Sequence, residues 1–449
     1  MVATCGLTGA IVPQGALAQA GPPADPAPAL PSTPPFDAAA KRQAIAAAAK
    51  LLTDDYVFPD LGAQAAAMLT QNLNAGKYDA DLTPGDFASH LTTDLRNLTH
   101  DKHLRVLVDA DAPSDAPPGP PPPPSGWYAF AQADRLKGNI GYIVLNGFTP
   151  KPISRQGADE AMGLLATTDA LIIDLRNNGG GDPRAVSYLV SFFFDAKTPV
   201  HVIDIVQRKF GTPDFDRQMF LTEPTPVSYL GKPVYLITSS HTFSAGEEFA
   251  YDMQTLKRGT LVGEATGGGA HPGGTQPIGP GLSLFVPSGR SESPITHTDW
   301  EGKGVQPDIA VPADQGFDTA YATALHALGR QVPAHAENAE AVTEAHLLPP
   351  TRTTAMPGSE TALRRLIVGL ADGHPPYDLL EDDLANLARK QEAGVQADLS
   401  PLGALQTLTF VKVVFGQDIY DAKFEKGTRR FMLVVNPDGK IAIFLAIRN

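Results

Sequence analysis

The sequence predicts an α/β core between a helical N-terminal domain and an α+β C-terminal domain. From about residue 139 onward, short apolar runs alternate with helical patterns, which is typical of βαβ units and of a sheet covered by helices. The preceding stretch is rich in alanine and has the apolar spacing of helices. After about residue 335, two helical patterns are followed by four strand-like runs. Together these three observations indicate the fold class.

The N-terminal domain is expected over residues 36–110. Its expected elements are helices at residues 37–55, 61–73 and 84–98 and a strand at residues 104–108. A polyproline spacer at residues 111–126 follows it. Residues 1–35 precede it and read as the remnant of an export signal joined to a proline-rich linker.

The core is expected over residues 127–335. Its expected elements are strands at residues 140–145, 170–175, 202–206 and 233–238 and helices at residues 157–167, 183–193 and 244–256. The run at residues 170–175 is almost continuously apolar, so we expect it to be buried on both faces of a sheet.

The C-terminal domain is expected over residues 345–449. Its expected elements are helices at residues 359–371 and 378–390, strands at residues 405–414, 419–424, 430–435 and 441–446, and a hairpin turn at residues 436–439. Because no catalytic cluster falls in this region, we interpret it as an accessory domain.

The first 20 residues point to a periplasmic or secreted protein. They are small and apolar and end in a cleavage-like A-x-A at Ala18-Gln19-Ala20, although they contain no Lys or Arg. A disordered tail is the alternative. The single cysteine, Cys5, excludes an internal disulfide, and the residues before it fit a lipid-attachment motif poorly. No apolar run reaches the roughly 18 residues of a membrane span, so we expect no stable membrane insertion.

Composition excludes several classes of partner. The net charge of −14 argues against nucleic acid, because phosphates repel an acidic surface. A hydrophobic content of 43% is ordinary for a folded protein. Histidines and carboxylates are scattered without a spacing such as H-E-x-x-H, so we expect no metal and no cofactor.

Ser244 is the first candidate for chemistry, because it stands where a buried strand gives way to a helix. A serine there lies beside the positive end of the helix dipole, which stabilises a developing oxyanion. The amide of Ala245 should point toward the same place. The alternative is structural, since Ser244 and Glu247 have the S-x-x-E spacing of a capping box.

Three further segments carry candidate residues. The segment 174–181 ends in three glycines after a buried strand, which lets the backbone approach a ligand and expose its amides. It lacks the Gly-Lys-Ser/Thr ending of a phosphate loop, and a plain tight turn is the alternative. The segment 263–274 is rich in glycine and contains His271, an available base. The segment 300–309 contains Glu301.

In this order and with these separations, the four segments resemble the tail-specific protease family. This family includes the C-terminal processing peptidases, the tricorn core and the interphotoreceptor retinoid-binding proteins. The resemblance covers about residues 36–325, and its motifs are D-L-R-N-N-x-G-G, S-A-x-E after a hydrophobic strand, G-E-x-T-x-G-x and G-V-x-P-D-I. It implies a crotonase-like core and a serine-type peptidase that acts on peptides or proteins without a cofactor. It says nothing of the oligomeric state.

The resemblance also implies residue roles. Ser244 would be the nucleophile, and the backbone amides of Ala245 and Gly180 would form the oxyanion hole, with Gly179 as the next candidate. The residues expected to line the substrate site are Gly179, Gly268, Gly269 and His271.

The chain departs from the processing peptidases at the general base. Those enzymes pair the serine with a lysine 25 positions later, and here that position is Gly269. Lys257, only 13 residues after the serine, is better explained as a solvated side chain. The stretch between Val108 and Asn139 is too short and too rich in proline for the PDZ domain of those enzymes. The chain therefore resembles the PDZ-less branch related to the retinoid-binding proteins.

A tricorn-like arrangement would supply the base differently. It uses a histidine from the segment before the core and a glutamate near the P-D motif, which His103 and Glu301 match. A neutral imidazole can take the serine proton, and a carboxylate can orient the ring. His100 and His271 remain alternatives for the base.

Peptide hydrolysis through an acyl-enzyme on Ser244 is the function these residues favour. A carrier of apolar ligands is one alternative, because retinoid-binding relatives share the fold and a fold does not determine activity. An esterase using the same serine is another. Loss of the lysine favours the carrier, whereas retention of Ser244, His103 and Glu301 favours the enzyme.

Overall fold

The computed structural model describes residues 36–108, 129–331, 341–343, 354–414, 417–435 and 439–447. The expected export segment, the polyproline spacer and most of the expected hairpin turn at residues 436–439 lie outside the described residues. Among the helices that the structure describes, each is too short or too polar to span a lipid bilayer.

The N-terminal helices and strand occur close to their predicted ranges. They are α1 (Ala38–Asp55), α2 (Pro59–Asn74), α3 (Pro84–Thr99) and β1 (Arg105–Val108). Helix α1 begins where the Asp37 carboxylate accepts hydrogen bonds from the amides of Ala39 and Ala40 at 2.8 and 3.0 Å. Helix α3 begins at Pro84, a residue whose missing N–H costs nothing in a first turn. These local signals explain why the prediction is confirmed.

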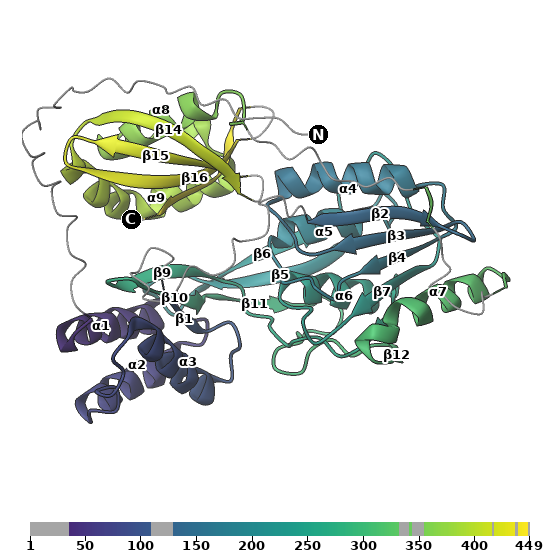
Figure 1. Cartoon of the computed structure of the whole chain (residues 1–449), viewed down its shortest axis with the longest axis horizontal. Coiled ribbons are helices and arrows are strands. Elements are labelled where there is room, and N and C mark those ends of the chain that lie inside the picture. Colours follow the sequence, from purple (N-terminus) through teal and green to yellow (C-terminus); the bar gives the residue numbers. More distant parts are fainter. Residues whose placement is uncertain are drawn as a thin grey trace, which may run out of the picture. The chain divides into compact units, whose positions relative to one another are not determined.

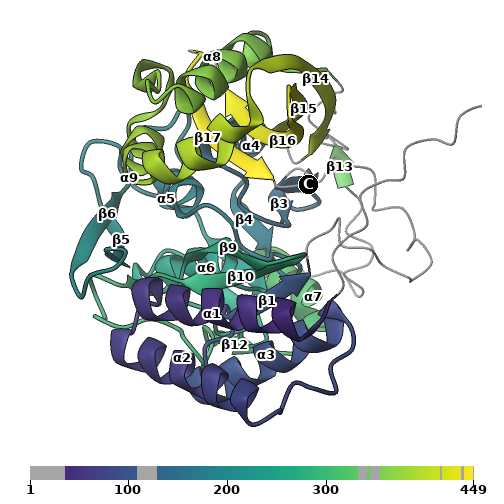
Figure 2. The same ribbon diagram turned by 90° about the vertical axis from the view of Figure 1, so that its left-hand side faces the viewer.

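A small sheet joins the N-terminal helices to later parts of the chain. Strand β1 pairs antiparallel with β10 (Leu282–Pro287), which pairs with β9 (Gly273–Gly279). Apolar side chains of β9 and β10 share one core with the three helices, in which Tyr56 and Phe87 are fully buried. Figure 2 shows α1 beside β9 and β10. The pairing brings the segment before β1 close to the loop before β9.

The core is built on a seven-stranded sheet of order β12-β8-β7-β4-β3-β2-β13. Its strands are β2 (Phe130–Leu136), β3 (Ile140–Leu145), β4 (Ala170–Asp174), β7 (Val234–Thr238), β8 (Thr260–Gly263), β12 (Ile309–Ala310) and β13 (Ala341–Thr343). In this sheet β3, β4, β7, β8 and β12 run parallel, whereas β2 and β13 pair antiparallel at one edge. Every residue of β4 is buried, as predicted.

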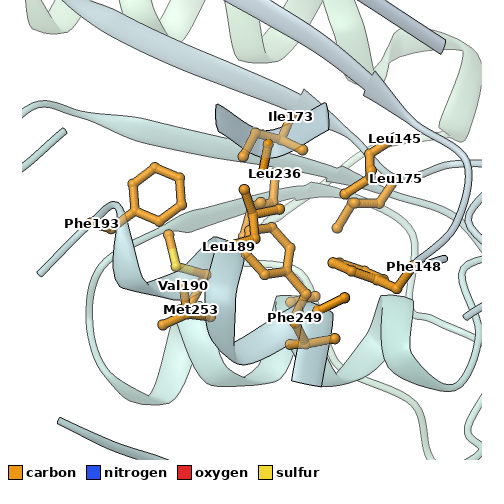
Figure 3. Packing of buried hydrophobic residues seen from close by; sticks show 14 of the residues in the cluster. Leu145, Phe148, Ile173, Leu175, Leu189, Val190, Phe193, Leu236, Phe249 and Met253 are labelled. Carbon is orange, nitrogen blue, oxygen red and sulfur yellow. The ribbon is translucent and has the colours of Figure 1, made fainter. Parts of the chain in front are cut away.

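Helices cover both faces of this sheet (Figure 1). They are α4 (Lys151–Leu165), α5 (Pro183–Ser191), α6 (Ala245–Thr255) and α7 (Gly316–Ala327). Helices α4, α5 and α6 share the main apolar cluster, whereas α7 packs in a separate cluster with the other face. Figure 3 shows Phe249 and Met253 of α6 near Leu189 and Val190 of α5. This packing fixes the helix that begins at Ser244.

One predicted helix start in the core is wrong, and several elements were not predicted. Helix α4 begins at Lys151 rather than residue 157, because a proline in its first turn does not interrupt it. The unpredicted elements are β2, β6, β8 to β13, α7 and a 3₁₀ turn at Ala313–Gln315. Strand β6 (Phe215–Leu221) is mostly exposed, so it lacks an apolar signal. It forms a three-stranded antiparallel sheet with β5 (His201–Arg208) and β11 (Gly289–Glu292).

The C-terminal region has the predicted two helices and four strands. They are α8 (Ser359–Ala371), α9 (Asp382–Leu399), β14 (Leu405–Val414), β15 (Gln417–Phe424), β16 (Gly427–Val435) and β17 (Ile441–Ile447), with 3₁₀ turns at Tyr377–Leu379 and Ser400–Leu402. The strands form an antiparallel meander in chain order. Helix α9 was predicted at residues 378–390 and in fact starts later and runs farther.

Candidate active site

Ser244 occupies a sharp turn between β7 and α6. Its backbone has φ 54° and ψ −124°, a conformation that side-chain-bearing residues rarely adopt. Such a residue costs about 1–3 kcal/mol and persists only where its surroundings hold it. The Ser244 amide donates to Glu247 Oε2 at 2.9 Å, and the Phe243 amide donates to the Asn178 carbonyl at 2.9 Å. The Ser244–Glu247 capping pair expected from the sequence therefore exists, and it holds a strained serine.

Gly180 lies directly against this serine. A Cβ at residue 180 would lie 2.7 Å from the Ser244 Cβ, and the backbone has φ 103°. Both facts require glycine. Asn178, which is fully buried, anchors the loop by donating from Nδ2 to the Leu145 carbonyl at 2.9 Å. The loop after β4 and the turn after β7 thus meet at the carboxyl ends of neighbouring parallel strands.

The candidate oxyanion amides have different partners. The Ala245 amide, at the first position of α6, has no hydrogen-bond partner among the described residues. The Gly180 amide donates to Asn178 Oδ1 at 3.0 Å, and the Gly179 amide donates to the Asn146 carbonyl at 3.3 Å. Of the three, the Ala245 amide is the one that is open to a ligand without rearrangement.

Glu247 ties the serine turn to the glycine-rich loop after β8. Its carboxylate is fully buried and accepts four hydrogen bonds, from the Ser244 amide (2.9 Å), the Thr266 hydroxyl (2.5 Å), the Gly268 amide (2.5 Å) and the Gly269 amide (2.8 Å). Burial raises the pKa of this carboxyl, and the hydrogen bonds oppose the rise. Gly268 and Gly269 were expected at the substrate site, and here their amides hold the loop against the serine turn.

His103 sits on the other side of Gly269. Its ring packs on Phe243 with 4.6 Å between centroids and on Phe285 with 5.8 Å. The side chain is buried, and both ring nitrogens lack a hydrogen-bond partner among the residues that the structure describes, Ser244 included. Burial lowers the pKa of His103 to about 4, so the imidazole is neutral at physiological pH. A neutral imidazole carries a proton on one ring nitrogen and can accept a second proton on the other.

The second histidine has fixed partners. His271 Nδ1 lies 2.8 Å from Asp101 Oδ2 and 3.6 Å from Glu301 Oε2. Burial acts to lower the pKa of His271, but the hydrogen bond and charge of Asp101 outweigh it and raise the pKa. Asp101 also accepts from the Tyr56 hydroxyl at 3.2 Å and from the His103 amide at 3.0 Å.

Glu301 joins this cluster from the loop before β12. Its Oε2 accepts from the Ala270 amide at 2.5 Å, whereas its buried Oε1 has no partner among the described residues. Burial raises the pKa of Glu301 to about 7. One ligand-type atom each of Asp101, His103 and Glu301 lie within 4.8 Å of one another. The structure therefore brings the predicted histidines and glutamate together around Asp101.

Comparison with known protein families matches two parts of the chain. The family described as peptidase family S41 matches residues 139–311, and the N-terminal domain of peptidase S41 in eukaryotic IRBP matches residues 38–127. The chain carries a peptidase family S41 domain. This family consists of serine peptidases. Ser244 and Glu301 fall in the first matched range and His103 in the second.

The relatives confirm the resemblance over part of their length. Carboxyl-terminal-processing peptidase 2 of Arabidopsis thaliana chloroplasts is 28% identical over 176 residues, which are 38% of this chain and 32% of that protein. Tricorn protease of Thermoplasma volcanium is 31% identical over 139 residues, which are 30% of this chain and 12% of that protein. This chain thus spans a third or less of these relatives. A solved structure of the photosystem II D1 C-terminal processing protease aligns at 15% identity with a TM-score of 0.42, covering 65% of this chain and 98% of that chain.

Residue 269 distinguishes this S41 domain from the lysine-dependent processing peptidases. A Cβ at Gly269 would lie 2.7 Å from His103 Cε1 and would also collide with the Phe243 ring. Any side chain at this position, including a lysine, would need the space that these two rings fill.

Sequence reasoning missed three residues of this candidate site. Asp101 and Tyr56 lie in the N-terminal region, and Asn178 lies in the glycine loop. The D-x-H spacing of Asp101 and His103 was a usable signal. Tyr56 had none, because tertiary contacts such as the pairing of β1 with β10 bring the N-terminal region to this loop.

Proposed function

We propose that this chain is a serine-type peptidase that hydrolyses peptide bonds through an acyl-enzyme on Ser244. The observation that carries the proposal is the packing at Gly269, where the His103 ring takes the space that a lysine side chain would need. The His103 ring fills, with its Cε1, the space that a side chain there would need. The ring packs on Phe243, the residue before Ser244, and its two nitrogens have no hydrogen-bond partner among the described residues. His103 thus takes the role of the missing lysine.

The reaction has two steps. Ser244 Oγ attacks the scissile carbonyl carbon while His103 accepts the hydroxyl proton. The C–N bond then breaks, and the amine leaves with that proton. A water molecule, deprotonated by His103, attacks the resulting ester and releases the acid, which restores Ser244. The His103–Ser244 contact has to close when substrate binds, as catalytic hydrogen bonds in free enzymes commonly do.

The Ala245 amide is the main oxyanion donor in this proposal. It stands at the N-terminus of α6 without a partner, where the helix dipole favours negative charge. Gly180 is the second donor, and its amide turns from Asn178 Oδ1 toward the oxyanion. Gly179, Gly268, Gly269 and His271 border the substrate.

Glu301 orients the His103 ring. Its free Oε1 and its place in the same cluster support this role, and Asp101 holds the backbone of His103 from the other side. The proposal further assigns the core to the crotonase type, with an N-terminal helical and a C-terminal accessory domain, and places the protein in the periplasm or outside the cell. Its substrates are peptides or proteins, and the names of its processing relatives favour protein C-terminal tails.

Active-site labelling tests the proposal. A fluorophosphonate probe should label the purified protein at Ser244, and Ser244→Ala should abolish the labelling. His103→Gln should slow labelling by about 100-fold or more, the scale expected for loss of a general base. Labelling that persists in Ser244→Ala would refute the nucleophile. A probe that labels Ser244 in a protein inactive on peptides but active on simple esters would favour an esterase.

A further inference from the structure

We infer that Asp101, His103 and Glu301 form a Zn²⁺ site, and that the bound ion withdraws His103 from catalysis. The ion binding rests on the geometry of these three side chains alone. The inhibition rests on the proposed function.

The three side chains offer free ligand atoms at the right separation. Both nitrogens of His103 and Glu301 Oε1 are buried and unpartnered among the described residues. Asp101 accepts three hydrogen bonds, whereas a carboxylate can accept about four, so one position remains. The candidate ligand atoms lie within 4.8 Å of one another. Two ligands of a tetrahedral Zn²⁺ lie about 3.3–3.6 Å apart, so the side chains have to close in by up to about 1.5 Å when the ion binds.

The charge of the cluster favours a cation. Asp101 is fully buried and Glu301 is largely buried, with 16% of its side chain exposed. Within the described part of the chain, the ion-pair partner of both carboxylates is His271, and no Lys or Arg pairs with either. Two carboxylates around one imidazole are therefore undercompensated. A divalent cation would favour the ionised form of both carboxylates and offset their charge.

The ligand types select the metal. Mg²⁺ and Ca²⁺ prefer sites made only of oxygen, whereas one imidazole with two carboxylates suits Zn²⁺. Three protein ligands leave a fourth position for water. Behind Asp101, the Tyr56 hydroxyl and His271 Nδ1 fix the carboxylate, as outer partners of metal ligands commonly do.

Zinc titration of the untagged, chelator-treated full chain tests the site. Calorimetry should show one saturable Zn²⁺ site per chain. His103→Ala and Glu301→Gln should each weaken it by at least about 100-fold, because a direct ligand matters more than an outer partner. Tyr56→Phe should weaken it by about tenfold.

The controls separate this site from surface binding and from misfolding. His201 Nε2 lies 2.8 Å from Asp204, so His201→Ala removes a histidine–carboxylate pair outside the proposed site. This variant should bind Zn²⁺ like the wild type. Circular dichroism should show that Glu301→Gln is folded. Absence of saturable binding, or equal binding by the wild type, His103→Ala and Glu301→Gln, would overturn the inference.

Labelling in the presence of zinc tests the inhibition. Saturating Zn²⁺ should block fluorophosphonate labelling of Ser244, and excess chelator should restore it. If zinc binds but Ser244 is never labelled, the proposed function fails while the metal site stands. If Ser244 is labelled and zinc does not bind, the metal inference fails while the proposed function stands. Labelling at the same rate with zinc bound would refute the inhibition.

Discussion

Buried carboxylates on the two faces of helix α6 differ in their hydrogen bonding. On the face toward the serine turn, Glu247 accepts four hydrogen bonds. On the other face, Glu248 Oε1 and both carboxylate oxygens of Asp252 are buried without a partner among the described residues. Burial raises the pKa of both Glu248 and Asp252, and each is raised further by a neighbouring carboxylate. Neighbours in sequence thus have different electrostatic roles.

This difference separates positioning from proton binding. Glu247 functions as an acceptor that holds three backbone amides and one hydroxyl in place. Glu248 and Asp252 are four residues apart, so they share one face of the helix, and the pair is most stable when it holds a proton. The Ser244 turn is therefore held by a hydrogen-bonded carboxylate, whereas Glu248 and Asp252 of the same helix are carboxyls that favour the neutral form.

The largest expected effect is on the serine side. Glu247→Gln replaces one carboxylate oxygen, which accepts hydrogen bonds, by an NH₂ group, which donates them. Because the partners of Glu247 are all donors, some of these buried donors lose their acceptor. We expect the free energy of unfolding to fall by about 3 kcal/mol and Ser244 labelling to slow by at least about tenfold. Urea denaturation at neutral pH and labelling kinetics measure these effects. Glu160→Gln, at an exposed position on α4, serves as the control, and equal stability of the two variants would contradict the role of Glu247.

An intermediate effect is expected on the opposite face, and it depends on pH. Burial raises the pKa of Glu248 from 4.5 to about 8, so the folded state retains a proton that the unfolded state releases between these values. Its contribution to stability is complete below pH 4.5 and is lost as the pH rises through about 8. Glu248→Gln should leave stability unchanged near pH 4.5 and raise it progressively as the pH increases to 8.

Denaturation curves across this pH range measure the effect. The wild-type free energy of unfolding should fall with rising pH more steeply than that of Glu248→Gln. Parallel pH profiles would show that Glu248 is not a buried proton-binding group, and the contrast between the two faces would then be wrong.

The smallest effect is expected at the junction between the serine turn and His103. Gly269→Ala places a Cβ 2.7 Å from His103 Cε1, so the ring has to move. We expect labelling to slow by about tenfold, equivalent to about 1.4 kcal/mol. Gly274→Ala is the matched control, because a Cβ there meets no atom within 4 Å. Equal labelling rates in the two variants would mean that the position of His103 does not matter to the serine.

Much of the fold could be predicted because its signals are local. Asp37 and Thr83 mark helix starts, and the apolar run of β4 indicates a buried strand. Strand β6 and the early start of α4 escaped prediction, because an exposed strand lacks apolar alternation and a proline in a first turn looks like a break. Local patterns therefore predicted the helices and strands whose capping residues or apolar side chains stand out in the sequence.

The sequence by itself determined the turn at Ser244, the glycines around it and the S41 motifs, because strand ends, caps and close backbone approaches depend on adjacent residues. Only the tertiary structure brought residues of the N-terminal region to this turn. The pairing of β1 with β10 brings Asp101 and His103 to residues 269–301, and the choice between His103 and His271 depends on which ring is left without a hydrogen bond. Such contacts span more than 160 residues of chain, so no local pattern encodes them.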